Sequence, residues 1–173
     1  MDVQKQLKGK WILVVDDEED VLQIIYELLE TCKLDTASTY EQAKALLEKN
    51  QYHAAILDIM GVRGYDLLEI ATQRNIPALM LTAHALTKED LKKSAEKGAA
   101  FYAPNDIITW IHQAPKDEIA NIALYLADVL EARAKKQNPW AKWYERLSAF
   151  CDRRFGKDWK DQDPDFWDHL IKY

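Results

Sequence analysis

At 173 residues, the chain is long enough for one ordinary domain of roughly 100–150 residues with an appendage. A hydrophobic content of 48% beside 30% charged residues is typical of a soluble globular protein and argues against disorder. The apolar run at residues 11–15 is far shorter than the ~20 residues that span a bilayer, so no membrane association is expected.

The charge balance argues against nucleic acid as a partner. The formal net charge is −6, and residues 138–173 carry as many basic as acidic side chains, so the whole excess lies in residues 1–137. Neither part has the positive field that a nucleic-acid binder needs. A DNA-binding output is therefore disfavoured.

The amino terminus and the cysteines predict the compartment. Residues 1–10 are polar and lack the apolar core of a secretory signal. Cys32 and Cys151 lie far apart and have no metal-ligand spacing, which favours free thiols in a reducing compartment. We therefore expect a cytoplasmic protein.

The first predicted strand, residues 11–15 (WILVV), runs directly into a cluster of acidic residues. Apolar residues then recur at helical spacing and predict a helix over about residues 18–31. A helix dipole favours negative charge at its amino end, which explains Glu18, Glu19 and Asp20. It explains Asp16 and Asp17 less well, because they fall at the carboxyl end of the strand.

The prediction of a site depends most on residues 53–58 (HAAILD). Before them, residues 34–37 predict a second strand, and Thr39, three positions before Gln42, begins a helix. The uncharged run that Asp58 ends suits a buried parallel strand. Asp58 either starts the following turn, as Asp often does, or lies at the edge where open α/β sheets bind their ligands.

Two further units continue the alternation of strands and helices. Residues 67–71 mark a third helix, and residues 76–82 form a fourth strand that ends at Thr82. Residues 87–97 form a mostly polar helix that stops at Gly98, and residues 99–103 form a short fifth strand. This alternation indicates an α/β fold with a doubly wound parallel sheet.

Asp16, Asp17, Asp58 and Thr82 should therefore lie along one edge of the sheet. Right-handed crossovers place the carboxyl ends of all the strands at that edge. Three carboxylates and a hydroxyl from three separate strands are hard to explain as turn chemistry. Clustered carboxylates repel one another and need a cation, and their hard oxygen atoms suit Mg²⁺.

The carboxyl-terminal part is predicted to be helical. Pro115, at a first helical position, opens a long helix that runs to about residue 136. The basic stretch at 132–139 is the best boundary candidate and separates a tail at 138–173. Within the tail, aromatic residues lie at helical spacing, and Asp163 with Pro164 begins a second short helix. The tail either packs as core or forms a docking or dimerisation surface, because Trp and Tyr are enriched at interfaces.

The order and spacing of four segments resemble the receiver domains of bacterial response regulators. The segments are ILVVDDEEDV (12–21), AAILDIM (54–60), ALMLTAHA (78–85) and KGAAFYAPN (97–105), and the resemblance covers roughly residues 9–130. It implies a flavodoxin-like (βα)₅ fold of strand order 2-1-3-4-5, with a receiver domain at 9–137 and a helical extension at 138–173. It also implies Mg²⁺-dependent phosphorylation of Asp58 by a sensor histidine kinase or a phosphotransfer protein, with Asp58 itself among the metal ligands.

The resemblance also implies roles for other residues at the sheet edge. Asp17 resembles the direct Mg²⁺ ligand and Asp16 the water-mediated one, and the Met60 carbonyl would complete the protein's coordination. Thr82 resembles the hydroxyl that moves to meet the phosphoryl group, and Tyr102 the aromatic residue that follows it. The phosphoryl group adds about −1.5 to −2 charges, which is enough to reorder a loop.

Two features depart from the family pattern. The loop at 59–64 (IMGVRG) is shorter than usual and lacks the customary Pro, so we expect altered loop geometry but retained metal binding. The family's lysine after the fifth strand aligns with Asn105, which can donate a hydrogen bond but carries no charge. Lys116 either substitutes for that lysine, if residues 104–115 fold as an insertion, or is a solvated residue at the start of the last helix.

Three hypotheses of function are compatible with these residues. The first is a phosphoacceptor protein that switches conformation, assists its own phosphotransfer and dephosphorylation, and acts through protein partners, a homodimer among them. The second is a receiver-like binding module in which switching is weakened or lost with the lysine. The third is a phosphohydrolase, which is disfavoured because such enzymes place Asp-x-Asp after the first strand, where this chain has adjacent Asp16 and Asp17.

Overall fold

The sheet has the strand order that the sequence analysis predicted. The computed structural model describes residues 2–82, 87–104 and 122–172. Within them, five parallel strands form one sheet in the order β2-β1-β3-β4-β5. The strands are β1 (Trp11–Val15), β2 (Lys33–Ala37), β3 (Ala54–Asp58), β4 (Ala78–Thr82) and β5 (Phe101–Pro104). Their carboxyl ends therefore share one edge of the sheet.

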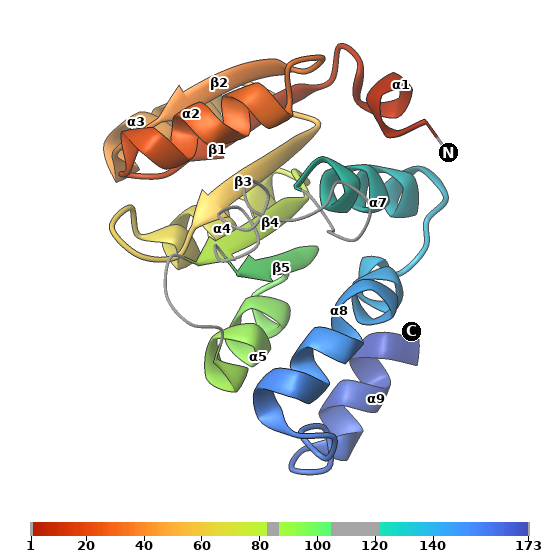
Figure 1. Ribbon diagram of the computed structural model, residues 1–173. Helices are drawn as coiled ribbons and strands as arrows, with labels where there is room; N and C mark the ends of the chain where they lie inside the picture. The colour runs from red at the N-terminus through yellow and green to blue at the C-terminus, as the bar shows by residue number, and fades with distance from the viewer. Residues whose placement is uncertain (1, 83–86, 105–121, 173) are drawn as a thin grey trace.

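Helices pack on both faces of this sheet and beyond its β5 edge (Figure 1). They are α1 (Val3–Leu7), α2 (Glu19–Leu28), α3 (Tyr40–Lys49), α4 (Gly64–Gln73), α5 (Lys88–Glu96), α7 (Ile122–Ala134), α8 (Pro139–Phe155) and α9 (Pro164–Lys172). On one face α3 packs against α4, and on the other α2 contacts α7. None of the helices in the described residues is both long and apolar enough to cross a membrane.

Capping side chains fix the starts of several helices at the residues that the sequence analysis indicated. The Thr39 hydroxyl accepts a hydrogen bond from the Gln42 main-chain N–H at 3.2 Å, and α3 begins at the next residue. The Thr87 hydroxyl accepts one from the Asp90 N–H at 3.1 Å at the start of α5. These bonds satisfy N–H groups that have no partner within the helix. The helix after β1 was predicted over about residues 18–31, and α2 is shorter, covering Glu19–Leu28.

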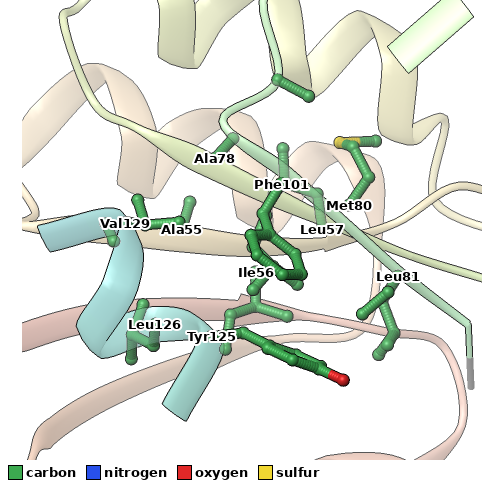
Figure 2. Close-up of a cluster of buried hydrophobic side chains, with 14 of the residues drawn as sticks. Ala55, Ile56, Leu57, Ala78, Met80, Leu81, Phe101, Tyr125, Leu126 and Val129 are labelled. Atoms are coloured by element: carbon green, nitrogen blue, oxygen red, sulfur yellow. The ribbon is translucent and has the colours of Figure 1, made fainter. Parts of the chain in front are cut away.

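The core lies where the central strands meet α7. Every residue of β3 and β4 is buried, which accounts for their uninterrupted apolar sequences. Figure 2 shows Ile56 of β3 near Phe101 of β5, with Tyr125 of α7 beside them. The rings of Phe101 and Tyr125 stack with centroids 4.6 Å apart. The strands that end at the acidic residues are therefore closely packed in the core.

The short helix α1 was not predicted from the sequence. Helix α1 is only five residues long, too short to show a helical period. Its Leu7 is fully buried, and the Gln6 side-chain amide donates a hydrogen bond to the Ala127 carbonyl of α7 at 3.0 Å. The segment before β1 is thus attached to the domain through α7.

The tail residues 138–172 form two helices that pack against the sheet domain. Asn138 caps α8, whose first residue is Pro139, and α9 begins at Pro164 as predicted. Four tail tryptophans are at most 4% exposed, namely Trp140, Trp143, Trp159 and Trp167. Of the two interpretations of the tail, the contacts in this structure match the packing one.

Candidate functional site

Three carboxylates converge at the carboxyl edge of the sheet. Asp16 and Asp17 directly follow β1, and Asp58 is the last residue of β3, the strand beside β1. Oxygen atoms from the three side chains all lie within 4.8 Å of one another. Pairing of parallel strands therefore brings together residues that stand more than 40 positions apart in the sequence.

Burial makes this cluster electrostatically costly. Asp16 and Asp58 are each only 2% exposed. Desolvation, reinforced by the charges of Asp16 and Asp17, raises the pKa of Asp58 to about 7, against the effect of a hydrogen bond from the Met60 main-chain N–H. Desolvation likewise raises the pKa of Asp16 to about 6, although the Glu18 N–H donates to Asp16 Oδ1 at 2.9 Å. The site therefore favours either bound protons or a counter-cation.

The donor set fits a hard divalent cation. Asp16 Oδ2 and Asp58 Oδ1 are buried, and neither accepts a hydrogen bond from the described residues. Asp17 is exposed and supplies a third carboxylate on the solvent side of the cluster. Carboxylate oxygens left without donors are the ligands that Mg²⁺ prefers. The three carboxylates are thus of a type, and close enough together, that they could hold such a cation.

The loop after Asp58 passes close to the cluster because it contains glycines. Gly61 has φ +81°, and a Cβ atom at this position would overlap the Asp17 carboxylate. A Cβ atom at Gly64, which begins α4, would likewise overlap the Asp58 carbonyl. Met60, whose carbonyl was predicted to be a ligand, lies in this loop and is 53% exposed.

Thr82 ends β4, the strand that pairs with the β3 strand of Asp58, and Tyr102 lies on β5, on the far side of β4. Asp58 is in register with Leu81 of β4, so Thr82 follows one residue later at the strand end. Tyr102 is fully buried on β5, opposite Met80. Burial and the nearby groups Asp90 and Tyr65 hold the pKa of the Tyr102 phenol well above its usual range, and the Thr82 side chain acts in the opposite direction.

Some site residues were missed by the sequence analysis, and two predicted ones lie outside the described residues. Asn105 and Lys116, the two candidates for the lysine position, belong to the segment that is not described. The structure adds Tyr65 of α4, whose hydroxyl lies 3.3 Å from Asp90 Oδ1 and so connects α4 to α5 beside Tyr102. It also adds Gly61. Gly61 could have been found from the sequence, because glycine is typical of turns. No sequence pattern indicated that Tyr65 and Asp90 are in contact.

Comparison with known proteins agrees with this architecture. The sequence profile of the response regulator receiver domain matches residues 12–104. A curated relative, the two-component response regulator ARR18 of Arabidopsis thaliana, is 33% identical over 100 residues. That alignment covers 54% of this chain but only 16% of the relative, so the chain spans a small part of the plant protein's length.

Several experimental structures have the same fold. The receiver domain of the Francisella response regulator 1452 is 21% identical and has a TM-score of 0.56, covering 73% of this chain and 99% of that one. A CheY-like receiver domain protein from Methanospirillum hungatei is 25% identical with a TM-score of 0.53, over 75% and 94% of the two chains. The BeF3-activated receiver domain of DrrB, a Thermotoga maritima protein, is 26% identical with a TM-score of 0.50, over 74% and 96%.

Proposed function

Because this chain belongs to the response regulator receiver domain family, we propose that it serves two-component signalling as a phosphoryl acceptor, with Asp58 as the accepting residue. Receiver domains are signalling domains and not classical enzymes. The observation that carries the proposal is the convergence of Asp16, Asp17 and Asp58 within 4.8 Å, next to the strand that ends at Thr82. Burial of two of these carboxylates is a cost that a purely structural turn would not need.

The proposed reaction transfers a phosphoryl group from a phosphohistidine of a sensor histidine kinase or phosphotransfer protein. A carboxylate oxygen of Asp58 forms a bond to phosphorus while the bond between phosphorus and the donor nitrogen breaks. The leaving imidazole keeps the electron pair and is protonated. The chain contributes mainly by positioning, because Asp58 ends a fully buried strand that fixes the place of its main chain.

The same acidic cluster would bind the metal ion. Asp16, Asp17, Asp58 and the Met60 carbonyl are the groups that would hold Mg²⁺, in the roles that the family resemblance gives them. When bound, the ion neutralises charge on the carboxylates and on the phosphoryl oxygens. Asp16 and Asp58 each retain a buried oxygen with no donor from the described residues, which supports this assignment.

The conformational response is assigned to Thr82 and Tyr102. The phosphoryl group brings three strong hydrogen-bond acceptors to the end of β3, beside β4. Thr82 would donate its hydroxyl to one of them, and the Tyr102 ring, which lies near Thr82, would follow. Its neighbours Tyr65 and Asp90 would transmit the change to α4 and α5.

The division of the chain and its location belong to the same proposal. We divide it into a receiver domain at 9–137 and an extension at 138–173, supported by the break between α7 and α8. Lys136, in this break, has a left-handed backbone with φ +54°. Free Cys32 and Cys151 support a reducing, cytoplasmic setting.

The test is phosphorylation of the full chain by acetyl phosphate with Mg²⁺, followed by intact mass. We expect the wild type to gain one phosphoryl group and Asp58→Ala to gain none. Asp161→Ala, which removes an exposed carboxylate in the tail, is the control and should react as the wild type does. Equal labelling of wild type and Asp58→Ala, or no labelling of either, would rule out Asp58 as the acceptor.

A beryllofluoride titration separates switching from mere binding. This phosphoryl mimic was used to activate the similar DrrB receiver domain. If this chain switches, amide shifts should extend from residues 16–18 and 58–61 to Tyr102 and α5. Shifts confined to the metal site would favour the second hypothesis, a binding module in which Asn105 has replaced the switching lysine.

A further inference from the structure

A cavity lies at the edge of the sheet opposite to the acidic cluster, between the sheet and helices α7, α8 and α9. Its volume is 420 Å³, and sites for small molecules span roughly 300–1,000 Å³. From the sheet, Pro77 and Ala100 line it, and these residues directly precede β4 and β5. The three helices line it through Val129, Trp140 and Leu170. The cavity is therefore large enough for a small organic molecule.

The apolar side of this cavity is closely packed. The Trp140 indole is only 4% exposed, and its Nε1 donates a hydrogen bond to the Ala99 carbonyl at 2.8 Å. The Trp140 and Trp143 rings contact each other, with centroids 5.1 Å apart. Ile76 and Val129, which also line the cavity, are buried. Because these side chains are fixed by their own contacts, they offer an apolar surface that is already formed before a ligand binds.

The cation in this cavity is Arg133, in the last turn of α7. Its Nη2 donates a hydrogen bond to the Asn75 carbonyl, which fixes the position of the guanidinium group. A guanidinium has five N–H donors. The Arg133 side chain makes no other hydrogen bond or ion pair with the part of the chain that the structure describes. It therefore keeps donors that an anion could accept.

The surroundings of Arg133 are basic, although the chain has a formal net charge of −6. A neighbouring cavity of 420 Å³ shares Arg133 and Asn75 with the first, and Lys10 and His53 also line it. The Trp11 main-chain N–H donates to His53 Nδ1 at 2.9 Å, so the neutral His53 ring carries its proton on Nε2. Among the described residues that line either cavity, none is Asp or Glu. The local charge thus favours an anionic ligand.

We propose that the cavity between Arg133 and Trp140 binds a small organic acid. Its apolar body would pack against Trp140 and Val129, and its carboxylate would accept hydrogen bonds from the Arg133 guanidinium. The inference does not depend on the phosphoacceptor function, because Asp58 lies at the other end of the strands. The alternative role of Arg133 is structural, since a cation in the last turn stabilises a helix through its dipole. That role predicts an effect on stability and none on ligand affinity.

The first experiment compares two probes of similar shape, 1-naphthoate and its neutral analogue 1-naphthamide. Calorimetric titration of the full chain, in EDTA at low ionic strength, should give one naphthoate site with an affinity about tenfold above that for naphthamide, as expected for a charge-assisted hydrogen bond. Amide shifts caused by naphthoate should centre on Asn75, Ala99 and Trp140. Equal affinities, shifts centred elsewhere, or no binding of either probe would overturn the proposal.

The second experiment removes the charge of Arg133. Arg133→Gln keeps a donor for the Asn75 carbonyl, and it should lower the naphthoate affinity by about tenfold and leave the naphthamide affinity unchanged. Arg153→Gln is the matched control, because Arg153 also lies in the last turn of a helix, is exposed and lines neither cavity. It should bind both probes as the wild type does. If Arg133→Gln only lowers the free energy of unfolding and keeps the naphthoate affinity, the structural role is the correct one and the proposal fails.

A third variant fills the cavity from an exposed position. Thr72 lines the cavity at the end of α4, and its side chain lies beside Gly98. Thr72→Trp should therefore place a large ring in the space without disturbing the core, and both probes should bind much more weakly. A folded Thr72→Trp variant that binds both probes as the wild type does would show that they bind elsewhere, which contradicts the proposal.

Discussion

At the scale of single residues, close approach governs the acidic site. The Asp17 carboxylate has the Gly61 main chain directly beside it, in a backbone conformation with φ +81° that L side chains rarely adopt. Glycine is thus required at residue 61 both for its backbone and for the space of one missing Cβ atom. The geometry of the acidic cluster thus depends on a residue that contributes no carboxylate.

Gly61→Ala should therefore damage metal binding. The added Cβ would push the Asp17 carboxylate away from Asp16 and Asp58, and Mg²⁺ affinity should fall by about tenfold, the range seen for residues that orient ligands. Backbone strain should also lower the free energy of unfolding by about 1 kcal/mol. Calorimetric titration with Mg²⁺ and urea unfolding measure the two effects.

Gly9→Ala is the control that separates the effect of backbone strain from the overlap between the new Cβ atom and the Asp17 carboxylate. Gly9 has a similar φ of +73°, but a Cβ atom there would meet nothing within 4 Å. This variant should show the loss of stability and keep the Mg²⁺ affinity. Equal Mg²⁺ affinities for the two variants would show that the contact between Gly61 and Asp17 is unimportant.

At the scale of elements, a largely buried ion pair, between Asp128 and Arg146, connects the receiver domain to the tail. Asp128 of α7 has a side chain that is 1% exposed, and Arg146 of α8 holds it through Nε at 2.9 Å and Nη2 at 3.3 Å. A buried carboxylate that loses its cation is far more costly than a surface one. The packing of α7 against α8 thus depends on this pair as well as on apolar contacts.

Arg146→Ala should lower the free energy of unfolding by about 2 kcal/mol, less than for a fully buried pair because the arginine side chain is 31% exposed. Urea unfolding followed by circular dichroism measures this loss. Lys142→Ala, which breaks an exposed pair with Glu145, should cost at most about 0.5 kcal/mol. Combining Arg146→Met with Asp128→Leu should restore most of the loss. A single variant as stable as the wild type would contradict this role of the pair.

At the scale of the whole molecule, the acidic cluster links stability to pH and to metal. Burial raises the pKa of Asp58 from 3.8 to about 7, so the folded state holds a proton that the unfolded chain has released in this range. The free energy of unfolding should therefore fall as pH rises from about 4 to about 7. Mg²⁺ should oppose the fall, because it binds the ionised carboxylates of the folded state.

Urea unfolding in EDTA at about pH 5 and pH 8 tests this, with an expected contribution of Asp58 on the order of 2 kcal/mol. Asp58→Asn removes one of the two carboxyl groups with a raised pKa and should reduce the pH dependence. Saturating Mg²⁺ should stabilise the wild type more at the higher pH. Asp161→Asn should behave as the wild type. If, without metal, the wild type is more stable than Asp58→Asn at pH 8, the ionised Asp58 stabilises the fold. That result would contradict the predicted direction of the pH dependence.

The sequence by itself determined the alternation of strands and helices and the positions of Asp16, Asp17, Asp58 and Thr82 at strand ends. These features are local, because apolar periodicity and capping residues act within a few positions. The strand order came from the family resemblance alone, and it is the order that the structure has. The acidic cluster was predictable because every strand of a parallel sheet delivers its carboxyl end to the same edge.

Only the tertiary structure decided what surrounds that edge. The contact of Gly61 with Asp17, the position of Tyr65 and Asp90 beside Tyr102, and the docking of Trp140 and Trp143 on β5 all join distant segments. Such pairings have no periodicity to reveal them. They depend on which buried surfaces fit together when the whole chain packs, because shape and burial select one partner among many chemically similar ones.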